Sequence, residues 1–325
     1  MNSITADLLQ KFHDVHPATV QKLRDGLYVD DTIGGGNTVQ DLQEFKEEAA
    51  EIFQNGCFDL RKWKSTPTHI CPESADAPVD KILGIGWDRE NDVFILDPKS
   101  VCSPEIKTKR DLVASVSRFF DPLGLASSWH LRGKILIQRS WIQTTDWDAP
   151  LSPEVVENWK KWSMETCMHQ KTMVQIPRYV TVQNAELHVF SDASQCAYSA
   201  CVFLKSQESV SLLCARSRVA PLEGGGLTIP KLELTGCLLA ARLVTQVKGL
   251  VSSLRELPTY FWTDSSICLH WIRGADGPFA RFIKNRVNEI RRAGGAWNHV
   301  PGAENPADIG SRGCTLSELI ESSLW

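Results

Sequence analysis

The sequence predicts an α/β protein in which a mixed sheet flanked by helices forms the C-terminal part. Short runs rich in β-branched and aromatic residues, which are typical of strands, recur after about residue 181. Longer segments between these runs carry apolar residues at the period of a helix. The residues before them are mainly helical in pattern, with a few strands near the N-terminus. We therefore expect an α+β part, a helical segment and a sheet domain, in that order.

Residues 181–325 alternate strand and helix patterns. The expected strands are a run ending at Asp192 and the segments Ala197–Leu204, Ser211–Ser217, Thr259–Thr263 and Ala296–Val300. The expected helices are Lys231–Lys248, a short helix from Ser265, a basic helix near Phe279–Arg292 and a closing helix that carries Asp308. This order of elements predicts the sheet domain.

The preceding chain divides at about residue 98. In residues 1–98 we expect helices around Leu8–Phe12, Val20–Leu23 and Thr38–Gln54, strands at Phe58–Lys64 and Lys81–Trp87, and an irregular loop from Ser65 to Val79. In residues 99–180 we expect the helices Lys109–Phe119, Ser127–Ile142 and Pro153–Met168. The first two of these are separated at Asp121–Gly124, because proline and glycine interrupt a helix.

Four acidic residues in this series carry the functional prediction. Asp192 and Asp264 each end an aromatic-rich strand, Glu233 lies in the first turns of a long helix, and Asp308 follows Asn305-Pro306-Ala307. Taken singly, each could be a cap, a strand end or an exposed first-turn residue. As an ordered set they predict one carboxylate site. Such a site suits Mg²⁺, and two such ions can clamp an in-line phosphoryl displacement.

A strand, helix, strand and helix series that delivers four acids to one point resembles the type 1 ribonuclease H fold, from about Glu186 to Gly313. The resemblance implies that Asp192, Glu233, Asp264 and Asp308 ligate two Mg²⁺, with Mn²⁺ as a substitute. It also implies cleavage of the RNA strand of an RNA–DNA hybrid. Serine and threonine residues beside the acids are candidates to orient them, namely Ser191, Ser194, Thr263 and Ser265. Many relatives have a histidine after the last strand, where this chain has Ala303; His299 is expected within that strand.

A second acidic motif lies near the N-terminus, in Tyr28-Val29-Asp30-Asp31. The pattern predicts a hairpin that presents two adjacent carboxylates, although such dipeptides are also common in turns and helix caps. The motif resembles the palm hairpin of reverse transcriptases. That resemblance requires a further upstream aspartate and template-holding fingers, and only 27 residues precede Tyr28. We therefore expect no polymerase activity from this chain alone.

Several further stretches resemble the polyprotein of BEL/Pao-type LTR retrotransposons. They are Lys81–Trp87, Thr108–Asp111, Arg118–Leu125, Ile137–Trp141 and Asn305–Gly313. The resemblance implies a partial reverse transcriptase palm in residues 1–98, a thumb or connection in 99–180 and ribonuclease H in 181–325. Other parts of the polyprotein are expected partners. Aspartic peptidase activity is not expected, because the chain has no Asp-Thr-Gly or Asp-Ser-Gly loop and Asp264-Ser265-Ser266 lacks the glycine.

Composition indicates a globular protein without a membrane partner. The chain has 325 residues, of which 42% are hydrophobic, and no apolar run approaches the roughly 18 residues of a membrane span. The N-terminus lacks the pattern of a signal peptide. Ten cysteines include no Cys-x-x-Cys pair, and Cys201, Cys214 and Cys237 lie in apolar runs, so we expect reduced core residues. The expected location is cytoplasmic, with a virus-like particle or the nucleus as alternatives.

The net charge of −4 is unusual for a nucleic-acid binder, which normally has a basic face. One such face is expected on the basic helix, where Arg281, Lys284 and Arg291 fall near one side and could follow hybrid phosphates. The alternative is a solvated helix face. A different class of function also stays open, namely a catalytically inactive binding or interaction module left from a retroelement.

Overall fold

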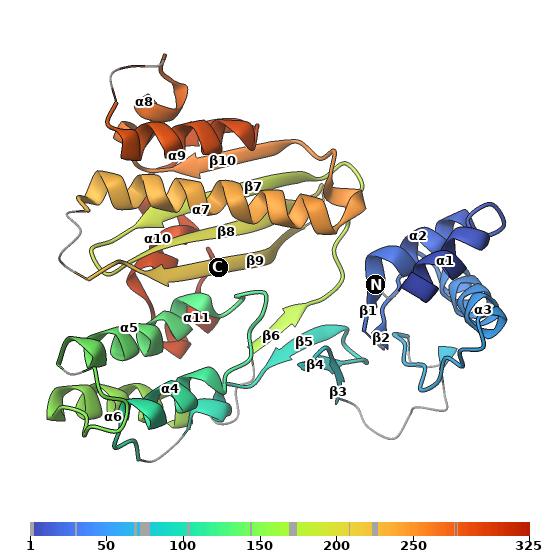
Figure 1. Cartoon of the computed structure of the whole chain (residues 1–325), viewed down its shortest axis with the longest axis horizontal. Helices are drawn as coiled ribbons and strands as arrows, with labels where there is room; N and C mark the ends of the chain where they lie inside the picture. Colours follow the sequence, from blue (N-terminus) through green and yellow to red (C-terminus); the bar gives the residue numbers. More distant parts are fainter. Residues whose placement is uncertain are drawn as a thin grey trace. The chain divides into compact units, whose positions relative to one another are not determined.

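A computed structural model of the chain describes residues 3–29, 31–67, 70–71, 79–102, 105–143, 145–168, 174–207, 209–222, 227–275, 277 and 279–325. The chain folds as two compact units (Figure 1). The first comprises Met1–Phe94 with Leu250–Ser252, and the second comprises Ile95–Gly249 with Ser253–Trp325. Helices, a mixed five-stranded sheet and two smaller sheets make up the described chain, so the predicted α/β class is confirmed. None of the described helices is long and apolar enough to cross a membrane.

The first unit is built on three helices, α1 (Ser3–Lys11), α2 (Pro17–Gly26) and α3 (Val39–Asn55). Helix α3 begins at a capping box, in which Thr38 and Asp41 bond to each other's backbone amides. The helices share a small apolar core that includes Leu9, Leu23 and Ile52. The predicted helices of this part are therefore confirmed to within a few residues.

The strands of the first unit differ from the prediction. Residues 58–64 form no strand, and left-handed backbone at Cys57 and Lys62 (φ 60° and 56°) interrupts an extended run. The expected single strand at Lys81–Trp87 is a hairpin of β3 (Val79–Ile82) and β4 (Ile85–Asp88). Its turn places Leu83 and Gly84 at positive φ, as a two-residue hairpin requires. The expected Ser65–Val79 loop lies largely outside the described residues.

The second unit begins with strand β5 (Val93–Leu96) at the boundary and the short helix η3 (Pro98–Val101). Three helices follow, α4 (Lys109–Ser117), α5 (Ser127–Gln143) and α6 (Pro153–Met168), as predicted. The Asp121 carboxylate accepts hydrogen bonds from the backbone amides of Leu125 and Ala126, which explains the break before α5. Trp129 and Trp162 are fully buried between these helices, with ring centroids 5.0 Å apart.

A five-stranded sheet forms the centre of the second unit, in the order β11-β10-β7-β8-β9. Strand β10 runs parallel to both β7 and β11, whereas β7, β8 and β9 are antiparallel. The sheet strands are β7 (Glu186–Ala193), β8 (Ala197–Lys205), β9 (Val210–Val219), β10 (Thr259–Thr263) and β11 (Ala296–His299), and β6 (Val174–Pro177) precedes them. All five strands of the predicted domain are thus present.

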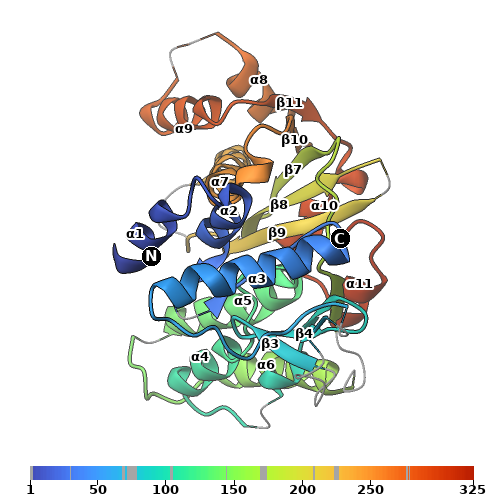
Figure 2. The ribbon, with the colours of Figure 1, turned by 90° about the vertical axis from the view of Figure 1, so that its right-hand side faces the viewer.

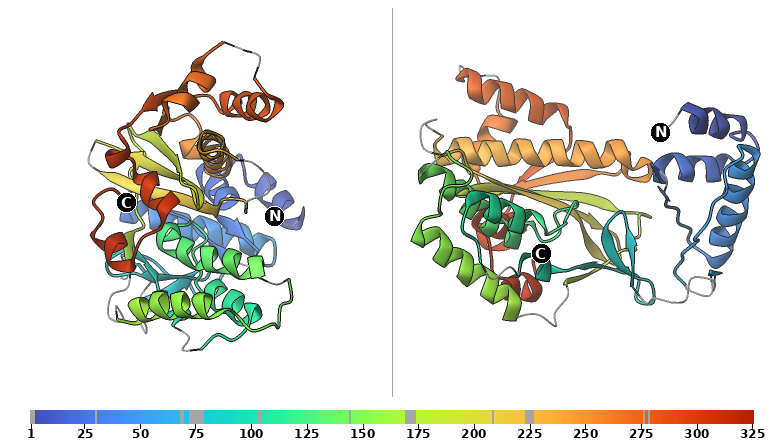
Figure 3. Two further views of the ribbon diagram at one scale, coloured as in Figure 1. Left: turned by 90° about the vertical axis from the view of Figure 1, so that its left-hand side faces the viewer. Right: turned by 60° about the horizontal axis from the view of Figure 1, so that its bottom comes forward.

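Helices cover both faces of this sheet (Figures 2 and 3). Helix α7 packs a long apolar stripe on one face, in a core that includes Val189, Val202 and Phe261. On the other face Ala307 of α10 packs against Cys201 and Phe203. The helical elements here are α7 (Ile229–Leu250), η4 (Ser252–Leu254), α8 (Ser266–Arg273), α9 (Arg281–Arg292), η5 (Gly302–Glu304), α10 (Pro306–Arg312) and α11 (Leu316–Glu321).

The cysteines follow the prediction in part. Cys201, Cys214 and Cys237 are free and buried in the sheet domain, as expected of reduced core residues. Cys102 and Cys167 differ, because their sulfur atoms are paired across 65 residues of sequence. The sequence around these two cysteines contains no pattern that indicates their proximity. They come together because α6 packs beside η3.

Close packing of α7 on the sheet depends on Gly236. A Cβ atom at this position would lie 2.9 Å from the carbonyl oxygen of Asp192 and 3.6 Å from that of Ser199. The absence of a side chain therefore lets the helix approach the strand that carries Asp192. The packing of α7 on the sheet therefore affects the position of Asp192, which is a predicted site residue.

We expect Gly236→Ala to destabilise the protein by about 1–3 kcal/mol, because an added methyl group cannot displace backbone. The control is Gly249→Ala in the same helix, where the new Cβ would meet no atom within 4 Å. There alanine should be neutral or stabilise by up to about 1 kcal/mol through helix propensity. Urea unfolding measures both changes, and equal effects at the two positions would contradict the packing argument.

Candidate active site

Asp192 lies near the end of the central strand β7 and is 6% exposed. The Ser311 hydroxyl of α10 donates a hydrogen bond to its Oδ2 atom. Burial raises the pKa of Asp192 from 3.8 to about 6, and the negative charges of Asp264 and Asp308 add to the increase, while the Ser311 bond opposes it. Neutralising this carboxylate at neutral pH therefore requires a nearby positive charge or a proton.

Asp264 follows strand β10, which is parallel to β7, so both strands deliver an acid to the same edge of the sheet. Burial raises the pKa of Asp264, and the charges of Glu233 and Asp308 act in the same direction. Its Oδ1 atom is buried and has no hydrogen-bond partner among the described residues. Gly302 of η5 lies against the other oxygen, where an added Cβ would be 3.1 Å from Oδ2.

Glu233 reaches the same edge from the first turns of α7. The Ser265 hydroxyl donates a hydrogen bond to its Oε2 atom at 2.5 Å. The same hydroxyl accepts from the backbone amide of Cys268 at 3.2 Å and so caps α8. Ser265 thereby fixes Glu233 relative to the strand end that carries Asp264.

Asp308 lies in the first turn of α10, where the Asn305 side chain caps the helix by accepting from the amide of Ala307. The Arg312 guanidinium, one turn later, donates to Asp308 Oδ1 at 2.6 Å. This bond raises the pKa of Arg312, and the charges of Asp192 and Asp264 contribute to the same increase. Arg312 is thus the cation that partly balances three of the four acids.

The structure therefore brings all four predicted acids to one edge of the sheet, from four separate elements. Their donor set fits a divalent cation, because every group is a hard carboxylate and one buried oxygen is unpaired. In the described ranges no group of three or more His, Cys, Asp or Glu side chains is arranged to hold an ion as it stands. Ser311 and Arg312 instead occupy oxygens of Asp192 and Asp308.

The second predicted motif forms a small hairpin in the first unit. Strand β1 (Leu27–Tyr28) pairs antiparallel with β2 (Asp31–Thr32), so Tyr28 lies opposite Asp31. Both side chains are exposed, and Val29 at the tip has a φ of 53°. Asp30 lies outside the described residues. The hairpin predicted for this segment is present, and its role in a polymerase stays a prediction.

The predicted basic face on α9 divides into two kinds of side chain. Arg281 and Lys284 are exposed and free to contact a nucleic acid. Arg291 instead donates to the carbonyl oxygens that end α8, at 2.9 Å to Ile272 and 2.6 Å to Gly274. It caps a helix C-terminus, so we do not include it in the proposed face.

Comparison with known proteins supports the fold and the family. Residues 108–265 match the family described as Pao retrotransposon-like RNaseH-like domain. The match spans helices α4 to α6 and contains Asp192, Glu233 and Asp264 of the candidate site. A search of curated proteins by sequence found no match.

Two solved structures resemble the chain over most of its length. The foamy viral protease-reverse transcriptase in complex with an RNA/DNA hybrid has a TM-score of 0.56 and 9% identity, over 91% of this chain and 37% of that one. The foamy viral protease-reverse transcriptase dRH in complex with double-stranded DNA has a TM-score of 0.52 and 11% identity, over 90% of this chain and 48% of that one. These likenesses show the fold, and this chain spans less than half of each neighbour.

Two residues of the candidate site, Ser311 and Arg312, were not predicted from the sequence. Their positions three and four residues after Asp308 on a short helix were the available signal, because such spacing places side chains on one helix face. Among the flanking hydroxyls, Ser265 bonds an acid, whereas the Ser194 hydroxyl donates to the Ser311 carbonyl oxygen at 2.7 Å. Ala303 lies in the short helix η5, directly after Gly302, the residue that lies against Asp264.

The raised pKa of Asp192 predicts a pH dependence of the metal-free protein. Asp192 holds its proton more tightly in the folded state, where its pKa is about 6, than in the unfolded state, where its pKa is the ordinary 3.8. Its contribution to the free energy of unfolding is therefore full below about pH 4 and lost as the pH rises through about 6. The loss amounts to at most about 3 kcal/mol.

Urea unfolding of wild type and Asp192→Asn in EDTA, at pH 4 and pH 7, isolates this contribution. The loss of stability between the two pH values should be smaller in Asp192→Asn. Other titrating groups are common to both proteins, so they largely cancel. Equal losses in the two proteins would show that Asp192 is not perturbed.

Proposed function

We propose that this chain acts as a ribonuclease H that cleaves the RNA strand of RNA–DNA hybrids by two-metal hydrolysis. The observation that carries the proposal is the convergence of Asp192, Glu233, Asp264 and Asp308 at one edge of an RNase H-like sheet. Repulsion among these buried or half-buried carboxylates favours cation binding. The Asp-containing loops required of an aspartic peptidase are absent from the sequence.

The side chains have distinct proposed roles. Asp192, Glu233, Asp264 and Asp308 would hold two Mg²⁺, or Mn²⁺ in their place. When bound, these cations supply activation of the attacking water and charge stabilisation at the leaving oxygen. Ser265 and Ser311 orient Glu233 and Asp192 through their hydroxyl hydrogen bonds. Arg312 holds Oδ1 of Asp308, so this oxygen would be available to a cation only if that hydrogen bond were broken.

An RNA–DNA hybrid is the proposed substrate. One structural neighbour was solved with an RNA/DNA hybrid, which supports this choice. Arg281 and Lys284 on α9 are exposed cations that could follow phosphates without reading sequence. Hybrid specificity would then depend on minor-groove shape and 2′-hydroxyl contacts.

The first unit is proposed to be part of a polymerase palm. The Tyr28–Asp31 hairpin supports this proposal, and the likeness to the viral reverse transcriptase covers 91% of the chain. We propose residues 1–98 as palm, 99–180 as connection and 181–325 as ribonuclease H, in a protein that works with other polyprotein parts. We assign no polymerase activity to this chain alone.

Cleavage of a labelled RNA–DNA hybrid in Mg²⁺ or Mn²⁺ tests the proposed function. Wild type should cut the RNA strand, and Asp192→Asn should abolish cutting because a metal ligand is lost. Ser265→Ala should reduce it by about 10–100-fold, as loss of a residue that orients a ligand does. The control Asp59→Asn removes an exposed aspartate of the first unit and should leave the rate unchanged.

Double-stranded DNA serves as the control substrate and should not be cut. A folded wild-type protein that cuts no hybrid in either metal would contradict the proposed activity. It would favour the second candidate function, an inactive binding module, for which Ala303 in place of a histidine is the supporting observation.

A further inference from the structure

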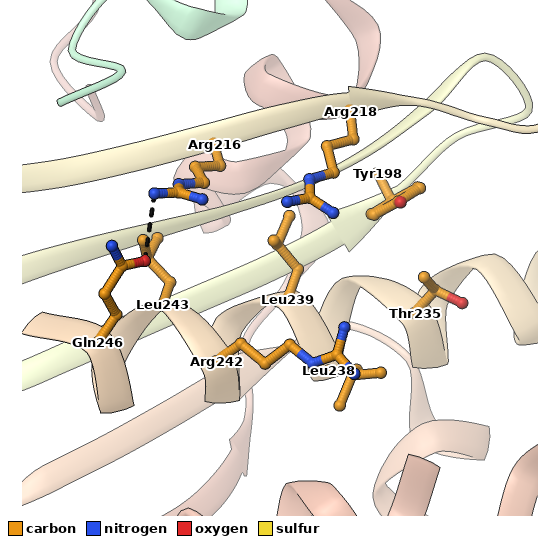
Figure 4. A pocket seen from close by; sticks show the side chains of 9 residues that line it. All are labelled: Tyr198, Arg216, Arg218, Thr235, Leu238, Leu239, Arg242, Leu243 and Gln246. Carbon is orange, nitrogen blue, oxygen red and sulfur yellow. Dashed lines mark hydrogen bonds between the residues drawn. The ribbon is translucent and has the colours of Figure 1, made fainter. Parts of the chain in front are cut away.

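A cavity of about 200 Å³ lies between strand β9 and helix α7 (Figure 4). This volume is several times the roughly 30 Å³ that one water molecule occupies in the liquid. Its floor is formed by buried leucines of α7, and none of the four clustered acids lines it. The polar groups around it are Tyr198, Arg216, Arg218, Thr235, Arg242 and Gln246.

The fold directs these polar groups to one place. Arg216 and Arg218 alternate along β9 and therefore project from the same face of the sheet as the buried Cys214. Tyr198 of β8 lies directly opposite Arg218 in the strand register. Arg242 faces them from α7 on the other side of the cavity (Figure 4). Three guanidinium groups thus surround one space.

Most of this positive charge is not balanced by acids. Arg242 forms a two-point ion pair with Glu289, at 2.6 and 3.0 Å. Arg216 donates to the neutral amide oxygen of Gln246 at 3.2 Å, so its charge remains. The Arg218 side chain is exposed and forms no hydrogen bond or ion pair with any described residue. The cavity therefore has two uncompensated cations on its β9 wall.

A further cation lies close to the β9 wall of the cavity. Lys134 of α5 lies behind β9, with its Nζ atom 3.4 Å from the carbonyl oxygen of Ser217. Burial lowers the pKa of Lys134, and the charges of Arg218 and Arg216 lower it further, against the opposing effect of Asp121. A bound anion would relieve this repulsion between like charges.

We propose that this cavity binds a phosphate group. Planar guanidinium groups bind phosphate oxygens through two parallel hydrogen bonds, and Arg216 and Arg218 are placed to do so from one strand. The Tyr198 hydroxyl provides a neutral donor at the same cavity. The phosphate could belong to a small molecule or to a nucleic-acid backbone. The site does not depend on catalysis by the acid cluster.

Thermal unfolding of the full chain in EDTA tests phosphate binding directly. The probe is inorganic phosphate, compared with chloride at equal ionic strength. Phosphate should raise the Tm of wild type, because a ligand of the native state stabilises it by mass action. The increase should be lost in Arg216→Gln/Arg218→Gln and retained in the control Arg255→Gln, which removes an exposed arginine away from the cavity.

Two further variants keep the test informative if the double variant is poorly folded. Arg218→Gln alone should reduce the phosphate-dependent rise in Tm. Glu289→Gln should increase it, because Arg242 is released from its ion pair. A wild type without a phosphate-specific rise, or a rise lost equally in Arg255→Gln, would overturn the proposal.

Binding of a fluorescent RNA–DNA hybrid in EDTA, measured over a range of salt, distinguishes the two sources of phosphate. If a backbone phosphate occupies the cavity, the slope of log K against log salt should become shallower by about 0.9 per lost contact in the double variant. If the ligand is a small phosphorylated molecule, hybrid affinity should match wild type while the phosphate-dependent rise in Tm is lost. Because no cutting is measured, failure here is distinct from failure of the nuclease proposal.

Discussion

Repulsion among four carboxylates at one edge of a sheet is the constraint on which the rest of the domain depends. Asp192 and Asp264 are held there by burial and by their neighbours, and the pKa of each is raised as a result. Hydroxyl donors and one arginine offset only part of the charge. Protons or cations that bind to such an arrangement therefore stabilise it.

The packing of the domain holds the acids in this unfavourable arrangement. Parallel pairing of β10 with β7 places two strand ends side by side, and helices on opposite faces bring in Glu233 and Asp308. Two glycines permit the close approach, Gly236 beneath Asp192 and Gly302 against Asp264. The apolar core on the α7 face therefore stabilises the fold against the electrostatic penalty of the site.

The sequence predicts the sheet domain well because each strand is a distinct apolar run and each acid follows a recognisable element end. It fails where conformation depends on unusual backbone, as at Leu83, whose positive φ turns an expected strand into a hairpin. The sequence also fails to predict the role of a residue when that role depends on tertiary contacts. Arg291 resembles a phosphate ligand in sequence but caps α8, and Arg312 contacts Asp308 only because α10 forms. The arginine-lined cavity likewise requires β9 and α7 to meet.

Direct binding of Mn²⁺ is the most decisive measurement for the acid cluster. Electron paramagnetic resonance follows the loss of the free-ion signal as the metal-free protein is added. We expect saturable binding of about two ions per chain, and loss of that binding in Asp264→Asn, which removes the acid with an unpaired buried oxygen. Absence of saturable binding to folded wild type, or equal binding by Asp264→Asn, would contradict it.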